Sequence, residues 1–319
     1  MTSGLPFDDI RSLISALPPL NAAVADQVRR DLAQSVTDSL GRIEKLAAWF
    51  AGATGRAPAR VNKAVVALFA ATHAVSRRLG VADPVGSARA RVEEIAAGAA
   101  PVSHLCAAGN LGLNVFDLAL EMPVEDITRA PALDERAAAA TMAFGMEAVA
   151  TGADLVCLGT ADDSADFAAK ALLSALAGTR GIEWPGQESV VITEALTFHR
   201  NHLEGPLEAM RRLGGREIAA LAGAILAART QGVAVILDGI AATSAAAALH
   251  ALNPDALGHC LIGASASEAH YAAAARIGLT PLLDLSTTEA GVAAAVAAGM
   301  VKSAGDISAG MAEVRARHR

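Results

Sequence analysis

Six short runs of consecutive apolar residues recur along this chain, and stretches with helical periodicity lie between most of them. A strand with one face in water alternates apolar and polar residues, whereas an unbroken apolar run is typical of a strand covered by helices on both faces. The pattern therefore predicts an α/β fold with a doubly wound, mainly parallel, Rossmann-like sheet of six strands. The predicted strands are 64–69, 115–118, 155–158, 233–237, 260–262 and 281–283.

Alanine dominates the composition and separates this chain from all-β proteins. The 319 residues include 77 Ala, whereas aromatic residues make up only 3%. Alanine has the highest helix propensity, and the strands of all-β proteins favour β-branched and aromatic residues. The composition therefore predicts closely packed helices around the sheet.

The spacing of apolar residues predicts where the helices lie. Segment 188–203 has two interpretations, because 190–192 is a strand-like apolar run while His199 and His202 continue a helical period. We expect 178–188 to form an exposed loop. Apolar residues at three- and four-residue spacings predict helices within 8–57, 134–151, 166–177 and 216–229.

The charge balance argues against a nucleic-acid partner. The chain has 26 Lys and Arg against 33 Asp and Glu, a net charge of −7, whereas nucleic-acid binding needs a basic surface.

The three cysteines of the chain, Cys106, Cys157 and Cys260, are far apart and lack CxxC spacing. They are typical of buried thiols in a reducing compartment.

The mean hydropathy of +0.38 raises the question of a membrane protein. The longest alanine-rich stretches are interrupted, as at Arg229, Asp238 and His250, before the roughly 18 residues that a membrane helix needs. The N-terminal residues MTSGLPFDDIRSL lack the basic and apolar regions of a signal peptide. We therefore expect a cytoplasmic protein without a membrane partner.

Three common nucleotide-binding or hydrolytic motifs are absent. The segment GNLGLN at 109–114 has the wrong spacing for GxGxxG, and no GxxxxGK[ST] occurs. The segment GASAS at 263–267 lacks the final glycine of a nucleophile elbow. Dinucleotide binding, P-loop chemistry and serine-hydrolase chemistry are therefore disfavoured.

Polar residues follow several predicted strands, at the edge where parallel sheets bind ligands. His73 follows the first run and is either a ligand-binding or a core histidine. Asp162 and Asp163 follow the third run, where they either bind a ribose or a cation or cap a helix. The last three strands are followed by Asp238, then Ser265, Ser267 and His270, then Thr287, Thr288 and Glu289. Three successive polar strand ends predict one convergent cleft.

Two other features are ambiguous. Gly214 and Gly215 directly precede the helix predicted over 216–229, so they either expose backbone N–H groups to a phosphate or only turn the chain. His199 and His202 have the spacing of metal ligands, but a solvated helix face is the favoured interpretation.

Several segments resemble the nicotinate-nucleotide:dimethylbenzimidazole phosphoribosyltransferases of cobamide synthesis. The segment LGGREIAALAGAILAARTQGVAVILDGIAATSAAAAL at 213–249 is similar to the family's LGGxEIAAMAGAxL followed by VPVVLDGFIAT. The segment at 261–285 is similar to the family's SAEPGH and LGLxPLLDL. Similar segments at 38–47, 67–76 and 130–148 extend the resemblance over nearly the whole chain.

The chain departs from the family pattern in three places. The glycine-rich GEMGIGNTT is replaced by 159–166, GTADDSAD, where Thr160 stands at the family's glutamate. The family's DHGV has become THAV at 72–75. The loop RLGEGSG is shortened to 286–291, which keeps a glutamate at Glu289 but loses the loop arginine. The added carboxylates predict weak binding of a phosphorylated substrate, and glycine at Asp162 and Ser164 is expected to tighten it.

The resemblance implies a small helical domain from 1–60 and 300–319 and an α/β nucleotide- and base-binding domain over 61–299. It also implies transfer of the phosphoribosyl group of nicotinate mononucleotide to a benzimidazole-like base, by a homodimer without metal or cofactor. Glu289 is the implied general base. The residues expected to bind substrate are His73, Gly159, Thr160, Asp162, Gly214, Gly215, Asp238, Ser265 and Ser267. The alternative is a non-catalytic paralogue or partner subunit that binds a nucleotide or a base.

Overall fold

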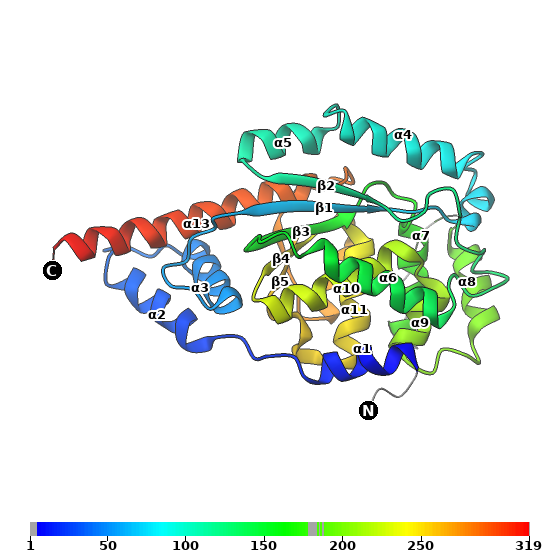
Figure 1. Ribbon diagram of the computed structural model, residues 1–319, viewed down its shortest axis with the longest axis horizontal. Helices are drawn as coiled ribbons and strands as arrows, with labels where there is room; N and C mark the ends of the chain where they lie inside the picture. The colour runs from blue at the N-terminus through cyan, green and yellow to red at the C-terminus, as the bar shows by residue number, and fades with distance from the viewer. Residues whose placement is uncertain (1–4, 178–183, 185, 187, 319) are drawn as a thin grey trace.

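The computed structural model describes residues 5–177, 184, 186 and 188–318, and it contains one parallel six-stranded sheet (Figure 1). The strand order is β2-β1-β3-β4-β5-β6, and every neighbouring pair is parallel. All six predicted strands are confirmed. Their bounds are β1 Ala64–Ala70, β2 Gly112–Asp117, β3 Leu155–Thr160, β4 Ala234–Leu237, β5 Cys260–Ala264 and β6 Pro281–Leu283.

Helices cover both faces of the sheet, as the unbroken apolar runs predict. Alternate residues of β1 divide between two cores: Val65 and Phe69 belong to one, Val66 and Leu68 to the other. The first core is built with α1 Pro6–Ser15, α6 Glu135–Ala148, α7 Asp166–Ala177, α8 Glu188–His199, α9 Pro206–Leu213, α10 Arg216–Gln231, α11 Gly239–Leu252 and α12 Glu268–Arg276. The second is built with α2 Ala22–Ala33, α3 Arg42–Thr54, α4 Pro84–Ala96, α5 Pro101–Gly109 and α13 Val292–Arg317.

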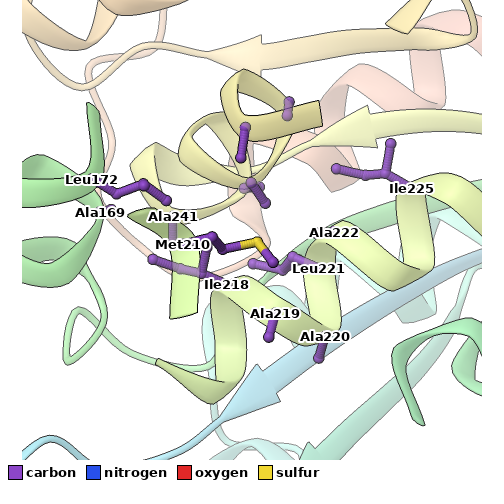
Figure 2. Close-up of a cluster of buried hydrophobic side chains, with 14 of the residues drawn as sticks. Ala169, Leu172, Met210, Ile218, Ala219, Ala220, Leu221, Ala222, Ile225 and Ala241 are labelled. Carbon is purple, nitrogen blue, oxygen red and sulfur yellow. The ribbon is translucent and has the colours of Figure 1, made fainter. Parts of the chain in front are cut away.

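Helix α10 is buried nearly all around. Figure 2 shows its side chains Ile218 and Leu221 among Met210 of α9, Leu172 of α7 and Ala241 of α11. Small residues line much of this helix, so neighbouring backbones approach closely. The alanine-rich composition thus serves helix-to-helix packing in this fold.

Helices α6 and α10 touch backbone to backbone at two glycines. A Cβ atom on Gly145 of α6 would lie 1.9 Å from the carbonyl oxygen of Ala220, and a Cβ on Gly223 of α10 would lie 1.9 Å from that of Met142. Neither position has room for a methyl group. Each helix therefore contributes one glycine that allows the backbone of the other helix to approach closely.

The ambiguous segment 188–203 begins with a helix, α8, so the strand interpretation of 190–192 is wrong. Val190 is exposed while Val191 and Ile192 are buried, which is the one-sided burial of a surface helix. Most of the loop predicted over 178–188 lies outside the described residues. Its residue Trp184 is buried, and the indole N–H donates to Ser174 Oγ at 2.9 Å, so exposure is wrong for that residue.

The N-terminal helices separate into two groups. Helices α2 and α3 pack with the C-terminal part of α13, where Arg315 pairs with Asp31 at 3.2 Å. Helix α1 instead packs against α6 and α11. Figure 1 shows α2, α3 and the C-terminus together at one end of the molecule. The division at 1–60 plus 300–319 stays a prediction.

Among the described residues, α13 is the one helix long and apolar enough to cross a membrane by length and composition. Of its most apolar 18-residue window, 56% is buried within the protein. Its first turns pack on β3, β4 and β5, and Cys157 Sγ lies 3.4 Å from the carbonyl oxygen of Ala294. These contacts are those of a core helix.

Candidate active site

A cavity of about 220 Å³ opens at the carboxyl ends of β3, β4, β5 and β6. This is the edge at which parallel α/β sheets bind ligands, because loops from several strands converge there. The cavity is lined by residues that follow each of these four strands. The convergent cleft expected from the sequence therefore corresponds to a cavity.

Half of the residues predicted to act at the site line this cavity. They are Thr160, Asp162, Asp238, Ser267 and Glu289. The other half do not contribute to its lining. They are His73, Gly159, Gly214, Gly215 and Ser265.

Asp238 fixes the wall of the cavity from the end of β4. Its carboxylate accepts hydrogen bonds from the backbone N–H of Gly291 at 2.7 Å and of Ala294 at 2.9 Å. It thereby holds the β6–α13 loop and the first turn of α13 against the sheet. Burial raises the pKa of Asp238 to about 6, although the two amide hydrogen bonds favour the charged form.

Gly159 makes room for Asp238 and does not touch the cavity. A Cβ atom at this position would lie 3.0 Å from the Cβ of Asp238. A side chain at this position would push Asp238 away by a few tenths of an ångström. Its contribution to the site is therefore through the position of Asp238.

The β3–α7 loop forms an acidic wall. Asp162, Asp163 and Asp166 all line the cavity. Asp162 Oδ1 accepts a hydrogen bond from the backbone N–H of Ser164 at 3.0 Å, and burial raises the pKa of Asp162. Burial also raises the pKa of Asp166, to about 7, because the attraction of Lys170 does not offset it.

Lys170 is the one Lys or Arg among the described residues that line this cavity. Its ammonium group pairs with Glu188 of α8 at 2.7 Å. Five carboxylates thus surround one lysine, counting Asp238 and Glu289. Such a cavity stabilises positive charge and hydrogen-bond donors, and it opposes a negatively charged ligand.

Glu289 lies on the β6–α13 loop at the mouth of the cavity. Its side chain is 51% exposed, and its carboxylate pairs with Arg91 of α4 at 2.8 Å. The backbone N–H of Glu289 donates to Thr287 Oγ1 at 3.1 Å, which shapes the loop. The carboxylate is therefore both reachable from the cavity and held at a defined place.

His270 forms the floor near α12 together with Ser267. Ser267 caps α12, and its hydroxyl oxygen accepts a hydrogen bond from the backbone N–H of His270 at 3.1 Å. The imidazole Nε2 lies 2.8 Å from Thr243 Oγ1, and Nδ1 faces the backbone N–H of Ala266 at 3.4 Å. Burial lowers the pKa of His270 to about 4, so the ring is neutral at pH 7.

His73 belongs to a buried network beside the cavity. Its Nε2 lies 3.1 Å from Glu217 Oε2, and both side chains are fully buried. Glu217 Oε1 also accepts from the backbone N–H of Ala71 at 3.1 Å and faces Ser164 Oγ at 3.2 Å. Burial acts to raise the pKa of Glu217, but His73 and these hydrogen bonds outweigh it, so the pKa is lowered.

This network changes the interpretation of Gly214 and Gly215. Gly215 begins α10 with φ +94°, and a Cβ there would lie 2.5 Å from His73 Cε1. The first turn of α10 faces the carboxylate of Glu217, a residue of the same helix. Gly215 therefore allows close packing on His73, and Gly214 allows close packing on Met210. Phosphate binding at this helix N-terminus stays a prediction.

The histidine pair at the end of α8 does not form a metal site. His199 is buried, and its Nε2 lies 2.9 Å from the carbonyl oxygen of Ile127. The solvated interpretation is therefore wrong for His199. His202 is exposed as expected, but it lies beyond the end of α8 and not on a helix face. Within the described part of the chain, no group of three or more His, Cys, Asp or Glu residues is arranged to hold a metal ion.

Three residues of the site were not predicted from the sequence. Arg91 and Lys170 lie on helices and carry no motif, and their importance follows only from what they touch. Glu217 lies within 213–249, the segment that is similar to the family, two residues after Gly215. A charged residue in this otherwise apolar helix is the sequence feature that indicates it.

Comparison with known proteins agrees with the geometry. A phosphoribosyltransferase family model matches residues 17–317. The nicotinate-nucleotide–dimethylbenzimidazole phosphoribosyltransferase of Sinorhizobium medicae is 49% identical and covers 97% of this chain and 96% of its own length. The Agrobacterium fabrum enzyme of the same name is 47% identical, with 98% and 95% covered.

A solved structure shows the same fold. It is the phosphoribosyltransferase of that name from Thermus thermophilus, with a TM-score of 0.80, 24% sequence identity, and 92% of this chain and 99% of its own covered. With the family model matching most of the chain and relatives nearly half identical over almost its full length, this chain belongs to the nicotinate-nucleotide–dimethylbenzimidazole phosphoribosyltransferase family.

Proposed function

We propose that the protein transfers the phosphoribosyl group of nicotinate mononucleotide to a benzimidazole-like base, in the assembly of a cobamide nucleotide loop. The relatives named for this activity support the reaction class. The observation that carries the proposal is Glu289, a carboxylate at the mouth of the strand-end cavity. It stands where the family resemblance implies the general base.

The reaction forms one bond and breaks one at the anomeric carbon. A ring nitrogen of the acceptor base bonds to this carbon, and the bond to the nicotinate nitrogen breaks with its electron pair going to nicotinate. The acceptor loses its N–H proton to Glu289. Positive charge develops at the anomeric carbon. At pH 8, above the raised pKa values of Asp166 and Asp238, the carboxylates of Asp162, Asp166 and Asp238 stabilise it electrostatically.

The cavity offers the phosphate of the donor few favourable contacts. Lys170 supplies one positive charge, and Ser267 supplies a hydroxyl donor at the N-terminus of α12. The acidic β3–α7 loop repels the same phosphate. The donor is therefore expected to bind weakly and to be held mainly through its ribose and ring.

The direct test is a transfer assay with the purified protein, nicotinate mononucleotide and dimethylbenzimidazole. Nicotinate and the ribazole phosphate are expected to form in equal amounts, measured by chromatography and mass spectrometry. If no transfer occurs with benzimidazole, purine or phenolic acceptors, the protein is a non-catalytic paralogue or partner subunit that binds a nucleotide or a base.

The acidic loop gives a second prediction, in which Asp162→Asn tightens the binding of nicotinate mononucleotide about threefold to tenfold at pH 8. Asparagine keeps the oxygen that accepts from Ser164 N–H and removes only the charge. Glycine at Ser164 would be a poorer test, because Ser164 Oγ contacts the buried Glu217. Calorimetric titration measures the affinity.

Nicotinate riboside, which lacks the phosphate, is the matched ligand control for Asp162→Asn. Its affinity is expected to stay within about twofold, since the removed charge acts mainly on the phosphate. An equal gain for riboside and mononucleotide would contradict the proposed repulsion.

The remaining expectations are also proposals. We expect a homodimer in the cytoplasm whose ligands are a nucleotide and an aromatic base, without nucleic-acid or membrane partners. The net charge of −7 supports the exclusion of nucleic acid. The chemistry of the proposed transfer requires no metal or redox cofactor.

A further inference from the structure

Arg91 joins two loops that form opposite parts of the cavity wall. It lies on α4, on the other face of the sheet from α7 and α10, and its side chain is only 19% exposed. Its guanidinium donates through Nε to the carbonyl oxygen of Ala161 at 3.2 Å and through Nη2 to Glu289 at 2.8 Å. One side chain therefore ties the β3–α7 loop to the β6–α13 loop.

A third contact fixes the guanidinium itself. Nη1 donates to Glu94, one turn further along α4, at 2.7 Å. Burial acts to lower the pKa of Arg91, but the hydrogen bonds and charges of Glu94 and Glu289 outweigh it and raise the pKa. The planar fork of Arg suits this geometry, because it offers several donors in fixed directions, which Lys does not.

The carboxylate of Glu289 has no other hydrogen-bond or ion-pair partner among the described residues. The loop that carries it is otherwise shaped by Thr287 and, two residues beyond Glu289, by the hydrogen bond from Gly291 to Asp238. Without Arg91 the half-exposed carboxylate of Glu289 is free to rotate into solvent. Displacement of a reacting group by about 1 Å is enough to cost roughly a hundredfold in rate.

We propose that Arg91 is a positioning residue for the transfer reaction. It binds the Glu289 carboxylate and the Ala161 carbonyl and so keeps the two cavity loops in fixed positions relative to each other. This rests on the proposed function, in which Glu289 takes the acceptor's proton. Arg91 is assigned no contact with substrate. Its effect is on where the Glu289 carboxylate lies.

The test compares Arg91→Ala with Arg91→Lys and with Arg89→Ala as the matched control. Arg89 lies on the same helix and pairs with Glu121 in an exposed ion pair outside the cavity. We expect Arg91→Ala to lower kcat/KM about 10- to 100-fold, mostly through kcat, and Arg91→Lys to recover only part of it. Arg89→Ala is expected to match the wild type within about twofold.

Two readouts separate positioning from a loss of folding. The KM of Arg91→Ala for nicotinate mononucleotide is expected to stay within about threefold of the wild-type value while kcat falls, because Arg91 is assigned no contact with substrate. Guanidinium at millimolar concentration is expected to restore part of the activity of Arg91→Ala. A kcat of Arg91→Ala equal to that of Arg89→Ala overturns the proposal.

Hydrogen exchange decides the case without turnover. Amides of 161–166 and 286–291 are expected to exchange faster in Arg91→Ala than in wild type or Arg89→Ala, with the exchange of β1 and β3 unchanged. If the wild type shows no transfer, the proposed function is wrong. The exchange measurement then still tests whether Arg91 holds the two loops. Equal exchange in all three proteins overturns it.

Discussion

Glu289→Gln is expected to lower kcat for phosphoribosyl transfer by about 10²–10⁴-fold while changing the melting temperature by less than about 2 °C. Gln keeps the shape and the hydrogen bond to Arg91 but cannot take a proton. The loss is expected in kcat and kcat/KM alike, since the interaction matters in the transition state. Steady-state kinetics with saturating mononucleotide measures it.

Glu93→Gln is the matched control, because Glu93 is an exposed glutamate of α4 that does not line the cavity. It is expected to keep turnover within about twofold. The competing interpretation treats Glu289 as an ordinary acidic residue near the start of α13. In that case Glu289→Gln costs roughly 0.3–1 kcal/mol of stability and leaves turnover unchanged, which would contradict its role as base.

Gly145→Ala and Gly223→Ala are each expected to destabilise the protein by about 3 kcal/mol, a fall in melting temperature of roughly 4–5 °C. In each case the new methyl group would overlap a backbone carbonyl oxygen at 1.9 Å. No side-chain rotation relieves such an overlap, so α6 and α10 must separate. Calorimetry or thermal denaturation followed by circular dichroism measures the loss.

Gly299→Ala and Gly310→Ala are the matched controls for these substitutions. Both glycines lie inside α13, and nothing lies within 4 Å of a Cβ built there. The same change is expected to stabilise the protein by about 0.5–1 kcal/mol, because Ala has the higher helix propensity. A loss of stability at all four positions would show that the tight α6–α10 contact is not the cause.

The strands were predictable because their signal is local. A run such as 64–69 is buried on both faces of a parallel sheet, so it reads as unbroken apolar sequence without knowledge of its neighbours. Segment 188–203 was less clear, because an apolar run of three residues fits a strand as well as a buried helix face. Its helix is settled by packing against α7.

The site residues could be predicted from the sequence only where they lie in loops that follow predicted strands. Asp238, Ser267 and Glu289 come directly after strands that are neighbours in the sheet, so their convergence follows from topology. Gly214 and Gly215 have the sequence of an anion site, but the local pattern does not reveal that the carboxylate of Glu217 faces the first turn of the same helix. Arg91 reaches Glu289 across 198 residues of sequence, and no local pattern encodes that contact.

The carboxylate that fills the start of α10 has a consequence for how this sequence can change. Glu217 joins His73, which follows β1, to Ser164, which precedes α7, and all three meet where solvent does not reach the Glu217 and His73 side chains. Replacing only one member of the histidine–glutamate pair leaves the other buried without its partner. For a charged group this lowers the free energy of unfolding by roughly 3–5 kcal/mol. Substitutions here are therefore tolerated only in combination, whereas the exposed loop tips around them are free to vary one residue at a time. Changes of ligand preference are therefore expected to be accessible at the exposed rim of the cavity and not at the buried pair behind it.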